Sequence, residues 1–389
     1  MIKTIGIIGA GLAGLSCARI FKAFGYEVIV FEKEADLGGV WSASRRYPGL
    51  CTQDSKTTFH LPDFPMPDDY PEWPSGQQMQ EYLQSYSDNF NLTNDIHFNH
   101  TVINAQYDEK QSQWKLTAQK TTGDQAKMTQ AVDFLMVCNG IYSEPSIPQY
   151  PGAEAFKDNG GTIFHTCEFT DTSAAKDKHV VVIGYGKSSC DVANAIADEA
   201  KSTTVVARQL IWKVPRMVAT VLNNKNIFAT RLSEALFPYI RLQGGDKFFQ
   251  GIGTPLRKLL IGTLSFVISK QLRLKKLDLL PKLSLAQIAN SSISQVSEGF
   301  YDKVARNELT VKRENEIISL GKGQATLING EVIPADIIIC GTGWQQKCPF
   351  LDDSFMQKIT DEHGNFLLYR NLLPIGCLLY TSPSPRDRG

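Results

Sequence analysis

Residues 4–14 read TIGIIGAGLAG, and this stretch decides the fold. The run at 4–8 is short and apolar, which predicts a buried strand. Residues 12–23 follow a glycine-rich turn with helical spacing of apolar side chains, and 27–31 (EVIVF) read as a second strand. Strand, helix and strand in this order predict a βαβ unit with a parallel sheet.

The turn itself, GAGLAG, has three glycines at the spacing of a dinucleotide-binding loop. Gly9 allows the tight turn, Gly11 lets the backbone approach a pyrophosphate, and Gly14 lets helix and strand pack closely. The helix N-terminus then offers N–H groups and its positive dipole end to the phosphates. Glu32 ends the second strand, where a carboxylate can bind both ribose hydroxyls. This context favours a ligand site over a turn without a ligand.

The same pattern begins again at residue 179. HVVVI is a strand, GYGKSS at 184–189 is a second turn, 187–198 is a helix and TTVVA is the next strand. Ser189 replaces the third glycine, and its small side chain should still allow close packing.

Arg208 follows the strand of this second unit. It lies 24 residues after Gly184, while Glu32 lies 23 after Gly9, so we expect equivalent places. A guanidinium there suits a 2′-phosphate, which it can grip bidentately. Glu32 therefore indicates FAD and Arg208 indicates NADPH, with a solvated strand-end charge as the alternative for Arg208.

Composition excludes several other classes of protein. The 389 residues predict two or three domains, and a formal net charge of zero gives no case for nucleic acid. The eight cysteines include no C-x-x-C pair, so we expect neither a metal site nor a redox disulfide. The N-terminus does not resemble a secretory signal, and the apolar run 259–268 is too short to span a bilayer. We expect a cytoplasmic protein, with contact to an intracellular membrane as a further option.

Two dinucleotide sites in one chain predict electron transfer between two cofactors. Since no metal-cluster or dithiol motif follows, O2 is the simplest final acceptor.

At this point residues 4–375 resemble class B flavoprotein monooxygenases, and among them the flavin-containing monooxygenases. The segments that carry the resemblance are Gly38-Gly39-Val40-Trp41, which lies beside FAD in that family, YPGL and DFPMPDDYP, which cross the flavin, Gly161, His165 and Phe169 of the fingerprint G-x-x-x-H-x-x-x-[Y/F], and Cys340-Gly341-Thr342-Gly343-Trp344, which returns to the FAD domain. The fingerprint's phenylalanine is displaced to Phe156. We take His165 as an orienting residue of the linker and not as a general base.

The resemblance implies an NADPH- and FAD-dependent monooxygenase, similar to N,N-dimethylaniline monooxygenases. Such an enzyme inserts one oxygen atom of O2 into a soft nitrogen or sulfur nucleophile of a small molecule, through a flavin C4a-hydroperoxide. Two alternatives stay open: an NADPH oxidase or reductase without oxygenation, and a truncated, non-catalytic nucleotide-binding chain. The substrate and the oligomeric state are not determined by the sequence.

Two departures from the family pattern concern specificity and catalysis. Baeyer–Villiger relatives have tryptophan where Phe169 stands, so the sequence favours heteroatom oxygenation. Residues 52–56 (TQDSK) align with the family's T-N-x-P-K, which places Gln53 where an asparagine lies beside the flavin. Its amide offers the same donors and acceptor one methylene further out, so Gln53 is the candidate catalytic residue.

The predicted cofactor-binding residues come from these motifs together. They are Gly9, Gly11, Leu12, Ala13, Gly14, Glu32, Lys33, Gly39, Val40, Trp41, Thr52, Gln53, Gly184, Gly186, Lys187, Ser188, Ser189, Arg208, Gly341, Thr342 and Gly343.

Residues 241–276 combine many basic side chains with a predicted helix that begins at Thr254 and Pro255. Its leucines and valine at helical spacing (Leu256, Leu259, Leu260, Leu264 and Val267) form an apolar stripe. We favour packing of this stripe on the domain over a membrane-surface helix.

The expected fold is α/β, with two Rossmann-like dinucleotide-binding domains and the NADPH domain inserted in a discontinuous FAD domain. The expected parts are 1–170 (FAD domain), 171–324 (NADPH domain, with a helical insertion at about 226–306) and 325–376 (return of the FAD domain, truncated). We expect the ligands to meet at the carboxyl ends of the strands, between the domains. Residues 377–389 resemble translated adapter sequence, and we expect a non-native tail.

Overall fold

The computed structural model describes residues 2–228, 230–237, 244–288, 294–362, 364–369 and 372–374. The predicted tail at 377–389 lies outside these residues. The chain divides into two compact units. The first comprises Met1–Gly39, Leu83–Ser143 and Gln346–Gly389, and the second comprises Val40–Tyr82 and Glu144–Gln345.

The first unit is built on a parallel sheet in the order β3-β2-β1-β7. Strand β1 (Thr4–Ile8), helix α1 (Leu12–Ala23) and strand β2 (Glu27–Phe31) have the bounds that the sequence predicted. Strands β3 (Ile96–His97) and β7 (Phe134–Val137) complete the sheet. The predicted βαβ unit is therefore confirmed.

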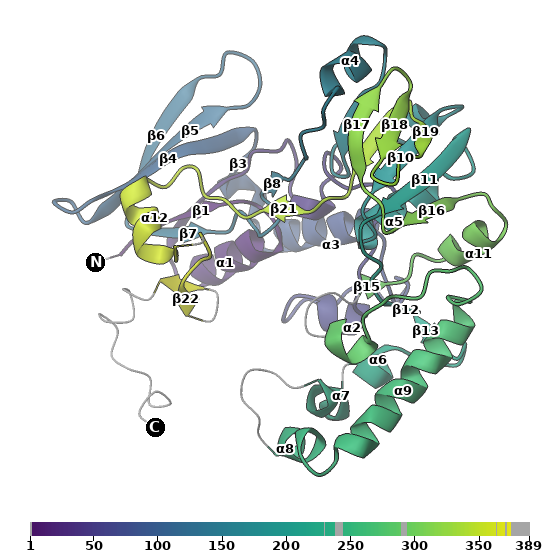
Figure 1. Ribbon diagram of the computed structural model, residues 1–389. Coiled ribbons are helices and arrows are strands. Elements are labelled where there is room, and N and C mark those ends of the chain that lie inside the picture. Colours follow the sequence, from purple (N-terminus) through teal and green to yellow (C-terminus); the bar gives the residue numbers. More distant parts are fainter. Residues whose placement is uncertain are drawn as a thin grey trace. The chain divides into compact units, whose positions relative to one another are not determined.

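An antiparallel sheet, β4-β5-β6, forms the other strand layer of the first unit (Figure 1). Strands β4 (His100–Asp108) and β5 (Gln113–Lys120) cover residues 101–107 and 113–118, where the sequence predicts strands, whereas β6 (Lys127–Val132) was not predicted. Strand β6 lies at an edge of the sheet and alternates exposed with partly or fully buried residues, but Met128 and Val132 are its only large apolar side chains, too few to signal a strand. Residues from this sheet and from α12 (Asp353–Ile359) form one core.

The second unit holds a five-stranded parallel sheet in the order β16-β11-β10-β20-β9. Its strands are β16 (Thr310–Arg313), β11 (Ser202–Ala207), β10 (His179–Ile183), β20 (Ile337–Cys340) and β9 (Thr162–His165). Helix α5 (Lys187–Ile196) follows β10, so the α/β class and a second Rossmann-like unit are confirmed. Strand β20, which we expected in the return segment of the FAD domain, pairs with β10 here.

Shorter elements fill the rest of both units. The antiparallel strands β17 (Ile317–Gly321), β18 (Gln324–Leu327) and β19 (Val332–Pro334) form one sheet. The remaining helices are η1 (Gly39–Trp41), α2 (Lys56–Phe59), α3 (Gly76–Asn89), η2 (Thr93–Asp95), α4 (Ala153–Asp158), η3 (Thr172–Ala175), α6 (Lys225–Phe228), α7 (Arg231–Leu236), α8 (Gly245–Gln250), α9 (Thr254–Gln271), α10 (Leu285–Ile288) and α11 (Phe300–Ala305). The remaining strands are β8 (Glu144–Pro145), β12 (Lys213–Val214), β13 (Met217–Val218), β14 (Leu222–Asn223), β15 (Ser294–Gln295), β21 (Trp344–Gln345), β22 (Leu368–Tyr369) and β23 (Leu373–Pro374).

Helix α9 buries a different face from the one we expected. Ile261 and Ile268 are buried in the core of the second unit, with Leu264 and Val267 partly buried beside them. Three members of the predicted stripe are instead exposed: Leu256 (45%), Leu259 (64%) and Leu260 (37%). Ile261 and Ile268 are seven residues apart and share one face, and the exposed leucines point away from it. Packing of the whole stripe was therefore a wrong expectation.

No helix in the described ranges has the length and apolar character that crossing a bilayer requires.

Candidate functional site: two glycine turns

The first glycine turn is held by backbone contacts that exclude side chains. Gly9 has φ +102°, and a Cβ there would lie 2.6 Å from the Cys138 carbonyl oxygen. A Cβ on Gly14 would lie 1.8 Å from the Gly9 carbonyl oxygen. Gly11 is the N-cap of α1, and a Cβ there would make an ordinary contact with the Gly39 Cα at 3.6 Å, so packing in the chain itself does not exclude a side chain at Gly11. The roles predicted for Gly9 and Gly14 follow directly from this packing.

Glu32 lies at the end of β2 and faces this turn. One carboxylate oxygen accepts a hydrogen bond from Ala10 N (2.7 Å) and the other accepts one from Glu34 N (2.9 Å). Burial raises the pKa of the Glu32 carboxyl, and these two hydrogen bonds oppose that rise. The turn therefore holds a carboxylate whose two oxygens each keep lone pairs for further hydrogen bonds.

The second glycine turn has a similar backbone conformation, but its small residues lie at different positions. Gly184 has φ +103°, and its Cβ position lies 2.6 Å from the Gly341 carbonyl oxygen. Ser189 takes the place of the third glycine, and Gly341 lies where the first unit has Cys138. A Cβ on Gly341 would lie 2.0 Å from Ser189 Oγ, so Gly341 makes room for the serine. The close packing that we predicted with Ser189 thus needs Gly341.

We expect Gly341→Ala to destabilise the second unit by about 1–3 kcal/mol, because the new methyl group overlaps Ser189 Oγ. Ser189→Gly should recover most of that loss in the double variant, but not all of it, since Ile183 O lies 3.0 Å from the same methyl position. Urea unfolding of the four chains measures this coupling. Gly186→Ala is the matched control: its Cβ meets nothing within 4 Å, so it should lose only the modest preference for glycine over alanine at the N-cap of α5. Equal losses in the single and double Gly341 variants would contradict the pairing.

Strand registers correct the place that we assigned to Arg208. Ile8 is opposite Phe31 in the first sheet, and Ile183 is opposite Val206 in the second. The residue equivalent to Glu32 is therefore Ala207, and Arg208 lies one position further, because the second spacing is one residue longer. Ala207 is buried and has no carboxylate, while Arg208 is exposed with no acidic partner among the described residues. The second unit therefore has no carboxylate at the position of Glu32, and the Arg208 guanidinium lies one residue beyond that position.

The segment 51–53 lies in the second unit and contains polar groups that lack partners there. Thr52 is fully buried, and neither its Oγ1 nor Trp73 Nε1 has a hydrogen-bond partner among the described residues. Arg216 lies over the Trp73 ring at 5.1 Å and donates from Nη2 to Cys51 Sγ at 3.0 Å. Buried polar atoms without partners are rare, and they fit a region that receives a polar ligand.

Gln53, the candidate catalytic residue, is held by Gln295 of β15. Gln53 Oε1 accepts from Gln295 N (3.3 Å), and Gln53 O accepts from Gln295 Nε2 (3.2 Å). The Gln53 side chain is exposed, and its own amide N–H₂ makes no hydrogen bond within the described part of the chain. Gln295 therefore fixes which way this donor points, a contact that the sequence did not reveal.

The fingerprint residues have structural roles. His165 is fully buried; its Nε2 donates to Gly343 O (3.1 Å), and its Nδ1 lies 3.2 Å from Cys167 Sγ. Burial lowers the pKa of His165, so the neutral ring is favoured. Phe156 fills the space beside Gly161, where a Cβ would lie 2.4 Å from its ring. His165 therefore positions the turn at 341–343, and Thr342 supports that turn by donating to Ser146 O.

The remaining predicted residues are divided between the units. Leu12, Ala13, Lys33 and Gly39 lie in the first unit, whereas Val40, Trp41, Thr52, Gln53 and Ser188 lie in the second. Trp41 is buried edge-to-face against Phe59 at 5.7 Å. Lys187 pairs with Asp191 (2.5 Å), so its charge is already compensated. Contact of these residues with either cofactor stays a prediction.

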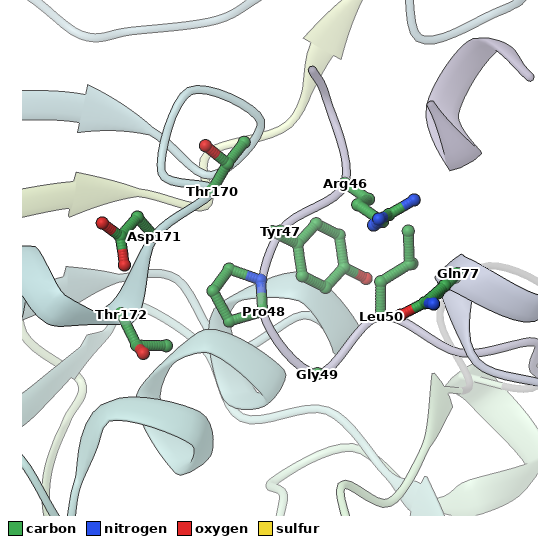
Figure 2. Close-up of a pocket in the computed structure, with 10 residues that line it drawn as sticks. Arg46, Tyr47, Pro48, Gly49, Leu50, Gln77, Thr170, Asp171 and Thr172 are labelled. Carbon is green, nitrogen blue, oxygen red and sulfur yellow. The ribbon is translucent and has the colours of Figure 1, made fainter. Parts of the chain in front are cut away.

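A hollow of about 420 Å³ opens along residues 46–50 of the second unit. Figure 2 shows Arg46, Tyr47 and Leu50 on one side and Thr170, Asp171 and Thr172 on the other. Its size lies in the range of small-ligand pockets. The segment that resembles the family's flavin-crossing stretch thus lines an open, polar space.

Comparison with known proteins agrees with this geometry. The family described as flavin-binding monooxygenase-like matches residues 2–241. Flavin-containing monooxygenase 3 of Canis lupus familiaris is 27% identical over 391 residues, covering 96% of this chain and 67% of that protein. Flavin-containing monooxygenase 1 of Mus musculus is 29% identical over 410 residues, with the same shares.

Solved structures share the fold at lower sequence identity. Cyclohexanone monooxygenase bound to ε-caprolactone superposes with a TM-score of 0.69 at 18% identity, over 98% of this chain and 79% of that one. The S-allyl-L-cysteine S-oxygenase of Allium sativum gives 0.57 at 17%, over 96% and 70%. Together with the family match over more than half of its length, the two glycine turns identify this chain as a member of the flavin-binding monooxygenase-like family, an enzyme that uses FAD, NADPH and O2 on a small-molecule substrate.

Proposed function

We propose that this chain transfers one oxygen atom of O2 to a nucleophilic nitrogen or sulfur of a small molecule, with FAD at the first glycine turn and NADPH at the second. The observation that carries this assignment is the contrast between the two strand ends. Glu32 is a buried carboxylate at the first, whereas the second has Ala207 and an exposed Arg208. A carboxylate selects a free ribose diol, and a guanidinium selects a 2′-phosphate.

The first turn fits the adenosine and pyrophosphate of FAD. No side chain projects from Gly9, Gly11 or Gly14 at the N-terminus of α1. Phosphate oxygens can accept hydrogen bonds from the backbone N–H groups there. The oxygens of Glu32, already oriented by Ala10 N and Glu34 N, receive the ribose hydroxyls. Bound there, FAD supplies the redox and oxygen chemistry of the family, and NADPH supplies the hydride.

The second turn fits NADPH in a corresponding way. A Cβ on Gly186 would meet nothing within 4 Å, so backbone at the N-terminus of α5 is open to a phosphate. Arg208 is free to bind the 2′-phosphate in two-point geometry. Strands β10, β11 and β16 lie within 171–324, the NADPH domain expected from the sequence, and β9 and β20 extend their sheet beyond those bounds.

Gln53 is the residue we propose at the reacting atoms. With its carbonyl oxygen held by Gln295 N, its N–H₂ group is the part that can donate to a ligand oxygen. The choice of nitrogen or sulfur over ketones is supported by Phe169, which is buried where Baeyer–Villiger relatives have tryptophan. No acid–base triad is needed, because the chain's part is to bind, orient and exclude water.

The experiment compares NADPH consumed with product formed on N,N-dimethylaniline, methyl phenyl sulfide and cyclohexanone. We expect oxygenation of the amine and the sulfide, with little lactone from the ketone. NADPH consumption that yields only hydrogen peroxide would favour the oxidase alternative, and a chain that cannot retain added FAD would favour the non-catalytic one.

Gln53→Leu should lower the product formed per NADPH about ten-fold, since one donor worth about 1–2 kcal/mol is lost. Released peroxide should rise in proportion, while flavin reduction by NADPH stays as in the unaltered chain. Gln53→Asn is the matched variant and should retain more coupling, because it keeps the amide. Unchanged coupling in Gln53→Leu would show that Gln53 does not reach the reacting atoms.

The cellular location of this chain is a separate proposal. We keep the cytoplasm as the expected compartment, and the exposed leucines of α9 (Leu256, Leu259 and Leu260) mark the surface that would meet an intracellular membrane.

A further inference from the structure

A lysine is buried beneath the second glycine turn. Lys213 belongs to β12 and is only 1% exposed, which is rare for an ammonium group. Its Nζ donates to Ser294 Oγ (2.9 Å) and to Gly186 O (3.4 Å), and it lies 5.0 Å from the centre of the Tyr185 ring. Both Tyr185 and Gly186 belong to the turn itself, so this cation contacts the loop proposed to bind NADPH.

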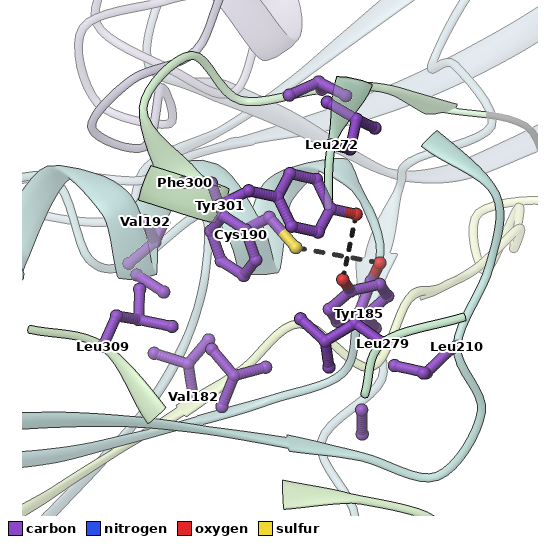
Figure 3. Close-up of a cluster of buried hydrophobic side chains, with 14 of the residues drawn as sticks. Val182, Tyr185, Cys190, Val192, Leu210, Leu272, Leu279, Phe300, Tyr301 and Leu309 are labelled. Atoms are coloured by element: carbon purple, nitrogen blue, oxygen red, sulfur yellow. Dashed lines mark hydrogen bonds between the residues drawn. The ribbon is translucent and has the colours of Figure 1, made fainter. Parts of the chain in front are cut away.

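The surroundings hold Lys213 in one position. Its strand pairs with β15, which places Ser294 opposite it. Tyr185 is fixed from the other side: Figure 3 shows its hydroxyl bonded to that of Tyr301 (3.0 Å) and Cys190 Sγ directed at its carbonyl oxygen. Since these partners are all neutral, they orient the ammonium group without cancelling its charge.

The buried charges around this turn do not balance. Asp191 is the nearby carboxylate, but it already accepts from Lys187 Nζ (2.5 Å) and Ser297 Oγ (2.5 Å), with Tyr47 OH at 3.5 Å. Lys213 itself has no carboxylate within ion-pair distance among the described residues. Two lysines therefore face one aspartate, in a region where an unpaired buried charge costs several kcal/mol. An anion at the N-terminus of α5 would supply the missing negative charge.

We propose that Lys213 is a cofactor-affinity residue: its buried ammonium, anchored by Ser294 beneath the glycine turn, attracts the pyrophosphate of the dinucleotide bound there. The inference rests on the proposed NADPH site, but Lys213 and Arg208 recognise different parts of the cofactor. Arg208 would distinguish NADPH from NADH through the 2′-phosphate. Lys213 acts on the pyrophosphate, which both cofactors carry, so it affects both equally.

Protonation of Lys213 is linked to binding. The groups facing it are Tyr185, Cys190, Asp191 and Lys187 from the turn and α5, together with Ser294 from β15. Burial lowers the pKa of Lys213, and Lys187 lowers it further, whereas Cys190 and Asp191 raise it. A bound pyrophosphate also raises it, so binding takes up protons wherever Lys213 is partly neutral in the free chain. Affinity should then fall as pH rises through the pKa of Lys213 in the free chain.

The test uses the FAD-loaded chain and measures binding of NADP⁺ and NAD⁺ by calorimetry, at two pH values and in two buffers of different ionisation enthalpy. Lys213→Met keeps an unbranched side chain, one heavy atom shorter, and removes the charge. We expect its dissociation constants for both nucleotides to rise about ten-fold, and its proton uptake to disappear. Lys201→Met, at an exposed position of the same unit, is the matched control and should bind as the unaltered chain does.

Unchanged affinity and unchanged proton uptake in a folded, flavin-loaded Lys213→Met would show that Lys213 is a structural residue only. If the methionine variant does not fold, Lys213→Gln gives the same readout with a polar side chain. Failure of the unaltered chain to bind NADP⁺ at all would instead overturn the proposed NADPH site, a result distinct from loss of affinity in Lys213→Met alone.

Discussion

Gly14→Ala should yield a chain that does not retain FAD. The Cβ of an alanine would lie 1.8 Å from the carbonyl oxygen of Gly9 and 3.0 Å from its carbonyl carbon. Both are backbone atoms of the turn, so no side-chain movement relieves the overlap. Helix α1 must move away from β1, and the N–H groups at its start then leave the place where the pyrophosphate binds. We expect a loss of about 3 kcal/mol or more in stability.

The measurement is the flavin absorbance of the purified chain, together with its urea midpoint. Gly262→Ala is the matched control, since Gly262 lies inside α9 and its Cβ would meet nothing within 4 Å. That variant should retain flavin and gain up to about 1 kcal/mol, because alanine is the better helix former. A flavin-containing Gly14→Ala chain of unchanged stability would contradict the close packing of α1 on β1.

Arg208→Gln should abolish the preference for NADPH over NADH. Arg208 is exposed at the end of β11 and has no acidic partner within the described ranges. Its charge is therefore available to the 2′-phosphate, and charged hydrogen bonds contribute about 1.5–3 kcal/mol each. The dissociation constant for NADPH should rise about one-hundred-fold, while that for NADH stays constant, because NADH has no 2′-phosphate.

Anaerobic stopped-flow reduction of the flavin, followed as a function of nucleotide concentration, measures both constants. Arg306→Gln is the control, since Arg306 is exposed in the same unit and pairs with Glu308 at 2.7 Å. If the dissociation constant for NADPH is the same in Arg208→Gln as in the control, Arg208 is only a solvated charge at the end of a strand.

Together with Lys213→Met, these two variants distinguish the residues that bind FAD, the 2′-phosphate of NADPH and the pyrophosphate of either nicotinamide nucleotide. Gly14 acts on FAD, Arg208 acts on NADPH alone, and Lys213 acts on both nicotinamide nucleotides.

Local sequence determined both βαβ units. The apolar run TIGII, followed directly by a glycine turn, is typical of a buried strand, and its bounds at residues 4–8 were those predicted. The local sequence also predicted the roles of the glycines at 9, 11 and 14, because those roles depend on backbone atoms within one turn. The sequence did not predict the edge strand β6, because only Met128 and Val132 among its six residues are large and apolar.

Only the tertiary structure decided the contacts between segments distant in the chain. Gly341 is a glycine because of Ser189, 152 residues earlier, and Gln53 is held by Gln295, 242 residues later. A lysine within the apolar run LIWKV at 210–214 was the one sequence signal for Lys213, but its place beneath the glycine turn follows from pairing with β15. Sequence periodicity indicates which face of an element is apolar, but it does not show which neighbours that face meets. Packing in the tertiary structure therefore decided which face of α9 is buried. Strand pairing decided the register that makes Ala207 the counterpart of Glu32.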